Sequence, residues 1–207
     1  FGLAGWLTRR FGVPLWMPRE EWTQARMLTL ETSETSRGAF GRFYHAAGFD
    51  EEMMDAAKAR SGRYARAVSR APTSFIRIAE DDEIKINGRA WRTIVGTGHS
   101  PEHACLYSPD LDVLISGDQV LPKISPNVSV WPQEPEADPL SLFLSSLDKL
   151  RTLGPNTLVL PSHNRPFRGL DARIDDLQHH HVERLEETRG ICSDPVNAVH
   201  VLRQLFK

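Results

Sequence analysis

The chain has 207 residues, of which 40% are apolar and 25% charged, and its formal net charge is -2 at pH 7. These values fit one soluble domain of ordinary size, or one domain with part of a second. The near-neutral charge argues against nucleic acid as the main partner, and no apolar run approaches the roughly 20 residues that cross a bilayer, so we expect no membrane partner.

The part of the chain before Pro72 is predicted to be mainly helical. Pro18 followed by the acidic Glu20 and Glu21 is typical of a helix start, and Gly48 is expected to stop a later helix. Pro72 ends this helical block. Helices are expected at about 3–10, 18–32, 37–47 and 50–69, with a short strand at 13–17 after the first of them.

From residue 75 to residue 115 the pattern changes to short strands. Asn87-Gly88 is the strongest hairpin signal in the chain, and Ser-Pro-Asp at 108–110 predicts a second turn. The proline-rich segment 121–137 is expected to be a loop.

A well-marked helix follows this loop. Asp138 is expected to be its N-cap, Pro139 its first residue and Gly154 its stop, and one apolar face should pack against a sheet. A strand at 157–160, a polar helix at 170–189 and an amphipathic segment at 195–206 complete the predicted elements. Together they indicate a mixed α/β (α+β) fold with a mixed, largely antiparallel sheet.

Three stretches share one sequence pattern: a β-branched apolar run, then a turn of Gly, Pro or Ser, then a residue that can bind a metal. They end at His99, Asp118 and His163. Strand ends are where a rigid sheet holds functional side chains, and two His with one Asp suit a divalent ion such as zinc. Residue types and spacing alone leave a metal site and ordinary loop residues about equally favoured.

The two cysteines, Cys105 and Cys192, are too few for a disulfide framework or a thiolate metal site. Cys105 lies in an apolar stretch, so we expect a buried thiol and a cytoplasmic location. The chain begins at Phe1 without Met and without a signal-peptide pattern. Both ends fall within helical patterns, and we interpret the sequence as the interior of a longer polypeptide.

Residues 97–103, Thr-Gly-His-Ser-Pro-Glu-His, resemble the Gly-His-Thr/Ser-Pro-Gly-His segment of metallo-β-lactamase-fold hydrolases. Residues 116–118, Ser-Gly-Asp, resemble the strand-end aspartate of that superfamily. Residues 161–164, Pro-Ser-His-Asn, resemble its Pro-Gly-His-Gly turn. The segments occur in the family's order, and the resemblance covers about residues 1–189.

The resemblance implies a partial αββα sandwich over residues 1–190, with a helical insertion at about 19–71. The most similar branches are the glyoxalase II-like thioesterases and the β-lactamase-like endoribonucleases. In the latter a winged-helix domain follows the catalytic domain, so residues 191–207 are interpreted as the start of such a domain.

The resemblance also implies a role for each ligand. His99 would bind the first of two zinc ions, Asp118 would bridge both, and His163 would bind the second. His103 matches a family position that is usually structural.

The family's first motif, His-x-His-x-Asp-His, is absent from the chain. That motif supplies further ligands for both ions, and its Asp orients the attacking water. We therefore expect weak or absent zinc binding, no complete catalytic group and negligible activity for this chain alone. We also expect exposed apolar surface and possible pairing into a homodimer.

The near-neutral charge favours a small acyl substrate, an ester or thioester. The loop after Asp118 is either a wall of the substrate pocket, with Trp131 as an apolar contact, or a rigid connector. Arg63 and Arg66 belong to a basic helix face that is either solvated or a clamp for an anionic substrate. The alternatives are a phosphodiesterase acting on RNA and a non-catalytic module that has lost its metal site.

Overall fold

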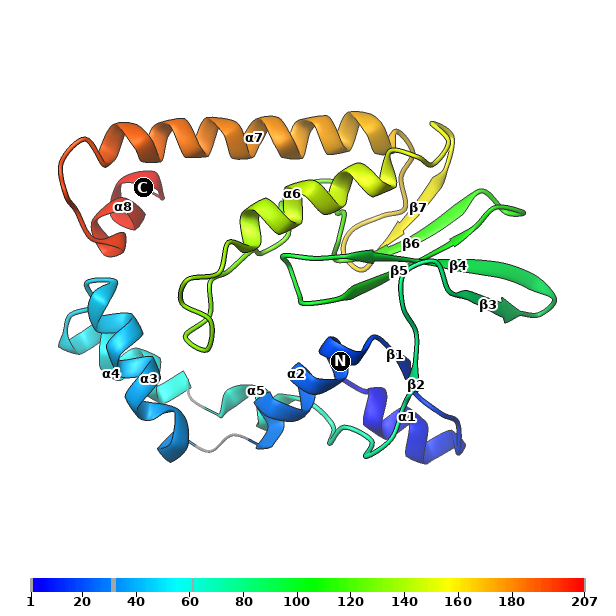
Figure 1. Ribbon diagram of the computed structural model, residues 1–207, viewed down its shortest axis with the longest axis horizontal. Helices are drawn as coiled ribbons and strands as arrows, with labels where there is room; N and C mark the ends of the chain where they lie inside the picture. Colours follow the sequence, from blue (N-terminus) through cyan, green and yellow to red (C-terminus); the bar gives the residue numbers. More distant parts are fainter. Residues whose placement is uncertain (1, 31–32, 61, 207) are drawn as a thin grey trace.

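Figure 1 shows the computed structural model, which describes residues 2–30, 33–60 and 62–206. A twisted five-stranded sheet is covered on one face by two helices, α6 (Pro139–Leu150) and α7 (Leu170–Ile191), which run side by side (Figure 1). The N-terminal helices at 4–11, 19–30 and 63–67 lie on the opposite side of the sheet, whereas those at 33–46 and 51–60 lie near the C-terminal helix (Figure 1).

The strand order of the main sheet is β3-β4-β5-β6-β7. The pairs from β3 to β6 are antiparallel, and β7 joins β6 in parallel, with a register shift between Ile115 and Gly117. The sheet is therefore mixed and largely antiparallel, as predicted. The strands are β3 (Glu83–Ile86), β4 (Arg89–Gly96), β5 (His103–Ser108), β6 (Val113–Gly117) and β7 (Leu158–Pro161).

Both predicted turns connect neighbouring strands. Asn87 and Gly88 have φ angles of 50° and 78°, the left-handed values that a tight two-residue hairpin requires between β3 and β4. The second turn joins β5 to β6, where the amide of Asp112 donates to the carbonyl of Pro109 at 3.2 Å.

The helices α6 (Pro139–Leu150) and α7 (Leu170–Ile191) bury their apolar sides against the sheet. Asp138 caps α6 as predicted, because its carboxylate accepts from the amide of Ser141 at 3.0 Å. The predicted stop at Gly154 is wrong: α6 ends at Leu150, since the chain tightens into a turn in which Arg151 N–H bonds Asp148 at 3.2 Å. The core side chains include Phe143, Leu147, Leu150, Ile174 and Leu177 from the helices and Ile94, Cys105, Leu114 and Val159 from the sheet.

The N-terminal block is helical, as predicted, but one of its helices is broken. The single helix expected at 50–69 is two, because Gly62 adopts a left-handed φ of 68° that ends regular winding. Thr32, the predicted end of the second helix, lies outside the described residues, as does Ser61. The elements are α1 (Ala4–Phe11), β1 (Trp16–Met17), α2 (Arg19–Leu30), α3 (Ser33–Ala46), α4 (Glu51–Arg60), α5 (Arg63–Ala67) and β2 (Ile76–Arg77), which pairs in parallel with β1.

The last helix, α8 (Ala198–Leu205), contacts the end of α3. Its Val199 amide donates to the carbonyl of Ala47 at 3.0 Å, and the Asn197 side chain lies directly over Gly48. A Cβ on Gly48 would be 2.3 Å from that side chain, which explains the glycine. The assignment of residues 191–207 to a winged-helix-like domain, like the insertion at 19–71, stays a prediction.

The arrangement confirms the predicted mixed α/β fold class. None of the helices in the described ranges combines the length and the apolar content that crossing a membrane would need.

Candidate functional site

Strand direction brings the three predicted ligands to one edge of the sheet. β4 and β6 are both antiparallel to β5, and β7 is parallel to β6, so the carboxyl ends of β4, β6 and β7 lie together. His99, Asp118 and His163 each follow one of these ends within three residues. Side chains far apart in sequence thus meet at one site.

The Asp118 carboxylate lies between the two imidazoles. Its Oδ2 is 3.5 Å from His99 Nε2, and its Oδ1 is 3.3 Å from His163 Nε2. One carboxylate oxygen faces each ring, which is the arrangement of a bridging ligand. All three side chains are accessible to solvent.

The loop after β6 sets the orientation of His99. Its Nδ1 is 2.8 Å from the carbonyl oxygen of Asn127, which only accepts hydrogen bonds. Nδ1 therefore carries the proton, and in the neutral ring Nε2 keeps its lone pair toward Asp118. A backbone carbonyl that fixes the tautomer in this way is a common support for a metal-binding imidazole.

Ser162 occupies the position of the first glycine in the family's Pro-Gly-His-Gly turn. It orients Asp118 from the side of β7. Its hydroxyl donates to Asp118 Oδ1, and its amide donates to the carbonyl of Gly117 at 3.0 Å. Asn164 has a φ of 68°, in the region that glycine prefers and asparagine tolerates. Asn164 thus adopts a backbone conformation that a glycine at this position would adopt freely.

His103 packs under the Asp118 turn. A Cβ on Gly117 would lie 2.3 Å from His103 Nε2, so only glycine leaves room for this ring. Burial and the neighbouring His99 lower the pKa of His103 below its usual value, although Asp118 and a hydrogen bond to Ser116 oppose this. The ring is half-buried, and the lowered pKa favours its neutral form, which fits the structural role that the resemblance implies.

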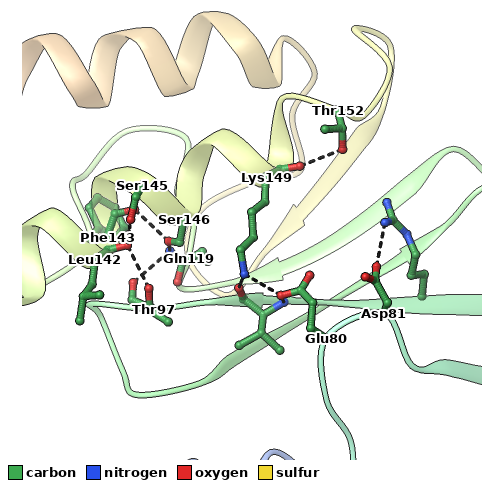
Figure 2. A network of polar contacts seen from close by, with 12 residues as sticks. Glu80, Asp81, Thr97, Gln119, Leu142, Phe143, Ser145, Ser146, Lys149 and Thr152 are labelled. Atoms are coloured by element: carbon green, nitrogen blue, oxygen red, sulfur yellow. Dashed lines mark hydrogen bonds and ion pairs between the residues drawn. The ribbon is translucent and has the colours of Figure 1, made fainter.

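A polar network ties two of the ligand turns to α6 (Figure 2). The Gln119 side-chain amide donates to Ser146 Oγ at 2.8 Å and to the carbonyl of Thr97 at 3.3 Å. The Thr97 hydroxyl donates to the carbonyl of Leu142 at 2.9 Å. Gln119 and Ser162 were not among the predicted site residues. Ser162 lies in the recognised 161–164 turn, but its contact with Asp118, like the contacts of Gln119, depends on tertiary structure.

A second link lies further along the same helix (Figure 2). Lys149 Nζ donates to the carbonyl of Val95 at 2.9 Å and to Glu80 at 2.6 Å, while Glu80 accepts from the Val95 amide at 3.2 Å. Both the amide and the carbonyl of Val95 are thereby bound. β4, which leads to His99, is held against α6 at two positions.

A cavity of about 260 Å³ opens beside His99. Its walls are the His99 turn, the loop after β6 with Trp131 and Glu134, the start of α6, and Glu20 and Gln24 of α2. Trp131, the predicted apolar contact, lines it. Arg63 and Arg66 lie on α5 and do not line this cavity, so their role in substrate binding stays a prediction.

The donor atoms fit a divalent metal in type but not in number. Two imidazole nitrogens and a carboxylate are typical zinc or iron donors. However, each position beside Asp118 has one imidazole and one carboxylate oxygen, and in the described ranges no three His, Cys, Asp or Glu side chains converge to hold one ion. The described residues therefore offer fewer donors than a closed metal site needs.

Comparison with known proteins identifies the family. The family model described as the metallo-beta-lactamase superfamily matches residues 1–163, a range that contains all three predicted ligands. No curated protein matches the chain significantly.

Solved structures give the same result. A beta-lactamase domain protein from Burkholderia ambifaria is 40% identical, with a TM-score of 0.85 over 100% of this chain and 60% of its own. A metallo-beta-lactamase family protein from Thermus thermophilus is 26% identical, with a TM-score of 0.82 over 100% of this chain and 64% of its own.

A third structure, of a protein in a di-iron-bound form, is 23% identical, with a TM-score of 0.51 over 84% of this chain and 68% of its own, and shows a shared fold.

The chain spans less than two thirds of the length of the first two relatives. With a family match over most of its residues, the chain belongs to the metallo-beta-lactamase superfamily.

Proposed function

We propose that His99, Asp118 and His163 are ligands of a two-metal centre that hydrolyses an ester or thioester. Membership of the superfamily supports a metal-dependent hydrolase in general. When bound, a divalent ion polarises a carbonyl group and lowers the pKa of a bound water. We propose zinc as the metal, and the di-iron form of one fold relative makes iron the alternative to test.

The lining of the cavity beside His99 is the observation that favours an acyl substrate. Trp131, Leu142 and two prolines give it apolar walls, while its charged lining residues are Glu20 and Glu134. No arginine or lysine is among the described residues that line it. Phosphodiester groups are normally bound by such cations, so this cavity suits an uncharged acyl group better than an RNA backbone.

The residues of the chain orient the site and shape the cavity. The Asn127 carbonyl orients the His99 ring, and the Ser162 hydroxyl orients the Asp118 carboxylate. Trp131 provides apolar contact surface in the cavity. Because each ion position has two protein donors, where zinc normally takes three or four, we expect this chain to bind zinc weakly.

Zinc titration by calorimetry tests the ligand assignment. We expect weak binding that His99→Ala, Asp118→Asn and His163→Ala each reduce about tenfold or more, as loss of one of few ligands implies. His179→Ala, on the exposed side of α7, is the matched control and should leave binding unchanged. Variants that bind zinc as the unaltered chain does would contradict the ligand assignment. Two equivalents of tightly bound zinc would contradict the expectation of weak binding.

The substrate class is tested with two probes and metal supplied in excess. The neutral thioester N-acetyl-S-butyrylcysteamine should bind, and Trp131→Ala should weaken its binding. A single-stranded oligoribonucleotide should bind less tightly at physiological salt. If the oligoribonucleotide binds more tightly and Arg63→Ala with Arg66→Ala weakens it, the substrate is RNA and the acyl proposal is wrong.

A further inference from the structure

Two hydrogen bonds between glutamates join the start of α2 to the His99 turn in both directions. The amide of Glu20 donates to Glu102 Oε2 at 2.8 Å, and the amide of Glu102 donates to Glu21 Oε1 at 3.2 Å. The partners are more than 80 positions apart in sequence. The pattern is that of a capping box, formed here between two segments instead of within one helix.

The start of α2 needs such a partner. The first amides of a helix have no acceptor within the helix, and the residue before α2, Pro18, has no side-chain oxygen to provide one. Glu102 supplies a charged acceptor at the positive end of the helix, where a carboxylate is most favourable.

The two joined segments form facing walls of one cavity. Glu20 and Gln24 line it from α2, and His99, Ser100 and Pro101 line it from the turn that leads to Glu102. The Glu20–Glu102 hydrogen bond therefore fixes the spacing of these walls. In the segment that residues 97–103 resemble, glycine stands at the position of Glu102, and glycine has no side chain to form this bond.

Other contacts of α2 lead elsewhere. The Trp22 indole donates to the carbonyl of Pro72 at 3.1 Å and stacks on Phe75 with ring centroids 4.7 Å apart. These contacts hold the helix to the segment before β2, whereas the glutamate pair bonds it to the His99 turn.

We infer that Glu102 is a positioning residue that holds α2 against the His99 turn and thereby fixes the substrate cavity. The inference rests on the proposed function in taking this cavity as the substrate site. The helical block is then a fixed wall of the site and a determinant of the size of substrate accepted.

The test compares Glu102→Ala, which removes the acceptor, with Glu102→Gln, which keeps a side-chain oxygen. Amide hydrogen exchange over residues 19–24 and the affinity for N-acetyl-S-butyrylcysteamine are measured on the full chain. We expect Glu102→Ala to speed exchange and weaken the probe about tenfold each, the effect of one lost charge-assisted hydrogen bond. Glu102→Gln should keep both the exchange rate and the probe affinity within about threefold of the values of the unaltered chain.

Glu186→Ala, an exposed glutamate of α7, is the control and should change neither measurement. The inference is overturned if Glu102→Ala lowers only thermal stability, or if Glu102→Gln is as impaired as Glu102→Ala. A further outcome is that the unaltered chain fails to bind the thioester while amide exchange is still faster in Glu102→Ala than in Glu102→Gln and the unaltered chain. In that case the proposed function fails and the positioning role stands.

Discussion

Gly98 lies where the chain turns from β4 into the His99 segment. It has a φ of 88°, and a Cβ there would lie 2.4 Å from the carbonyl oxygen of Pro139 and 2.5 Å from Phe143 Cβ. The start of α6 therefore packs directly on the backbone of the turn. The glycine of this segment is required by close packing as well as by backbone conformation.

We predict that Gly98→Ala lowers the free energy of unfolding by about 2 kcal/mol or more, because it adds both a clash and left-handed strain. Urea unfolding measures this. Gly154→Ala is the control, since its new Cβ would approach Thr157 Oγ1 no closer than 3.9 Å. Equal stabilities of the two variants would show that the packing at Gly98 is looser than described.

Cys105 is fully buried in the sheet, as the sequence predicts, and its Sγ lies 3.4 Å from the carbonyl of Ser116. Burial, with a smaller effect of Glu80, raises the pKa of the thiol to about 12. Because the thiolate is the reactive form, Cys105 should be inert in the folded protein.

We predict that a thiol reagent at pH 8 modifies one cysteine of the native chain, the exposed Cys192, and two after denaturation. Cys192→Ser should abolish the native reaction. Rapid modification of Cys105 in that variant would disprove the assignment.

At the scale of elements, α6 is the support of the site. It bonds the Thr97 and Val95 segments and the Gln119 side chain, and so aligns the ends of β4 and β6. α7 runs beside α6, and its His181 ring packs against Phe143 with centroids 5.9 Å apart. The two helices thus form one layer over the sheet (Figure 1).

Burial, and secondarily the neighbouring His180, lower the pKa of His181. Protonation is therefore less favourable in the folded than in the unfolded chain, where the pKa is about 6.5. The contribution of neutral His181 to the free energy of unfolding is therefore complete above pH 6.5. It is lost as the pH falls through the lower pKa that His181 has in the folded chain.

We predict that the melting temperature of the unaltered chain falls more steeply between pH 7 and 5.5 than that of His181→Leu. His179→Gln, which alters an exposed histidine of the same helix, should keep the original slope. Parallel curves for His181→Leu and the unaltered chain would refute the role of His181.

At the scale of the whole molecule, the structure leaves apolar surface uncovered. Leu3, Trp6, Leu7 and Phe11 of the α1 region are exposed, Trp6 at 48% and Phe11 at 63%, and Ile115 of β6 is exposed as well. An apolar surface of this kind normally associates with other protein.

We predict that the chain self-associates, with sedimentation coefficients that rise with concentration. The double variant Trp6→Glu with Phe11→Glu should shift it toward the monomer, whereas Arg10→Glu on the same helix should not. A monomer at all concentrations would contradict this and the predicted homodimer.

Local patterns made much of the fold predictable. The Asn87-Gly88 hairpin, the Asp138 cap and the apolar face of α6 depend on neighbours in sequence, so they can be identified without the fold. The break at Gly62 was missed because the surrounding residues favour helix, and the early end of α6 was missed because a turn without glycine stops it.

The sequence by itself determined the family motifs and the positions of the three predicted ligands, His99, Asp118 and His163, at strand ends. Only the tertiary structure decided that one carboxylate lies between two imidazoles, that Trp131 lines a cavity beside them, and that Glu102 joins this cavity to α2. The reason is physical. Turns and strand periodicity come from local backbone preferences, whereas these contacts join segments brought together by strand order and packing.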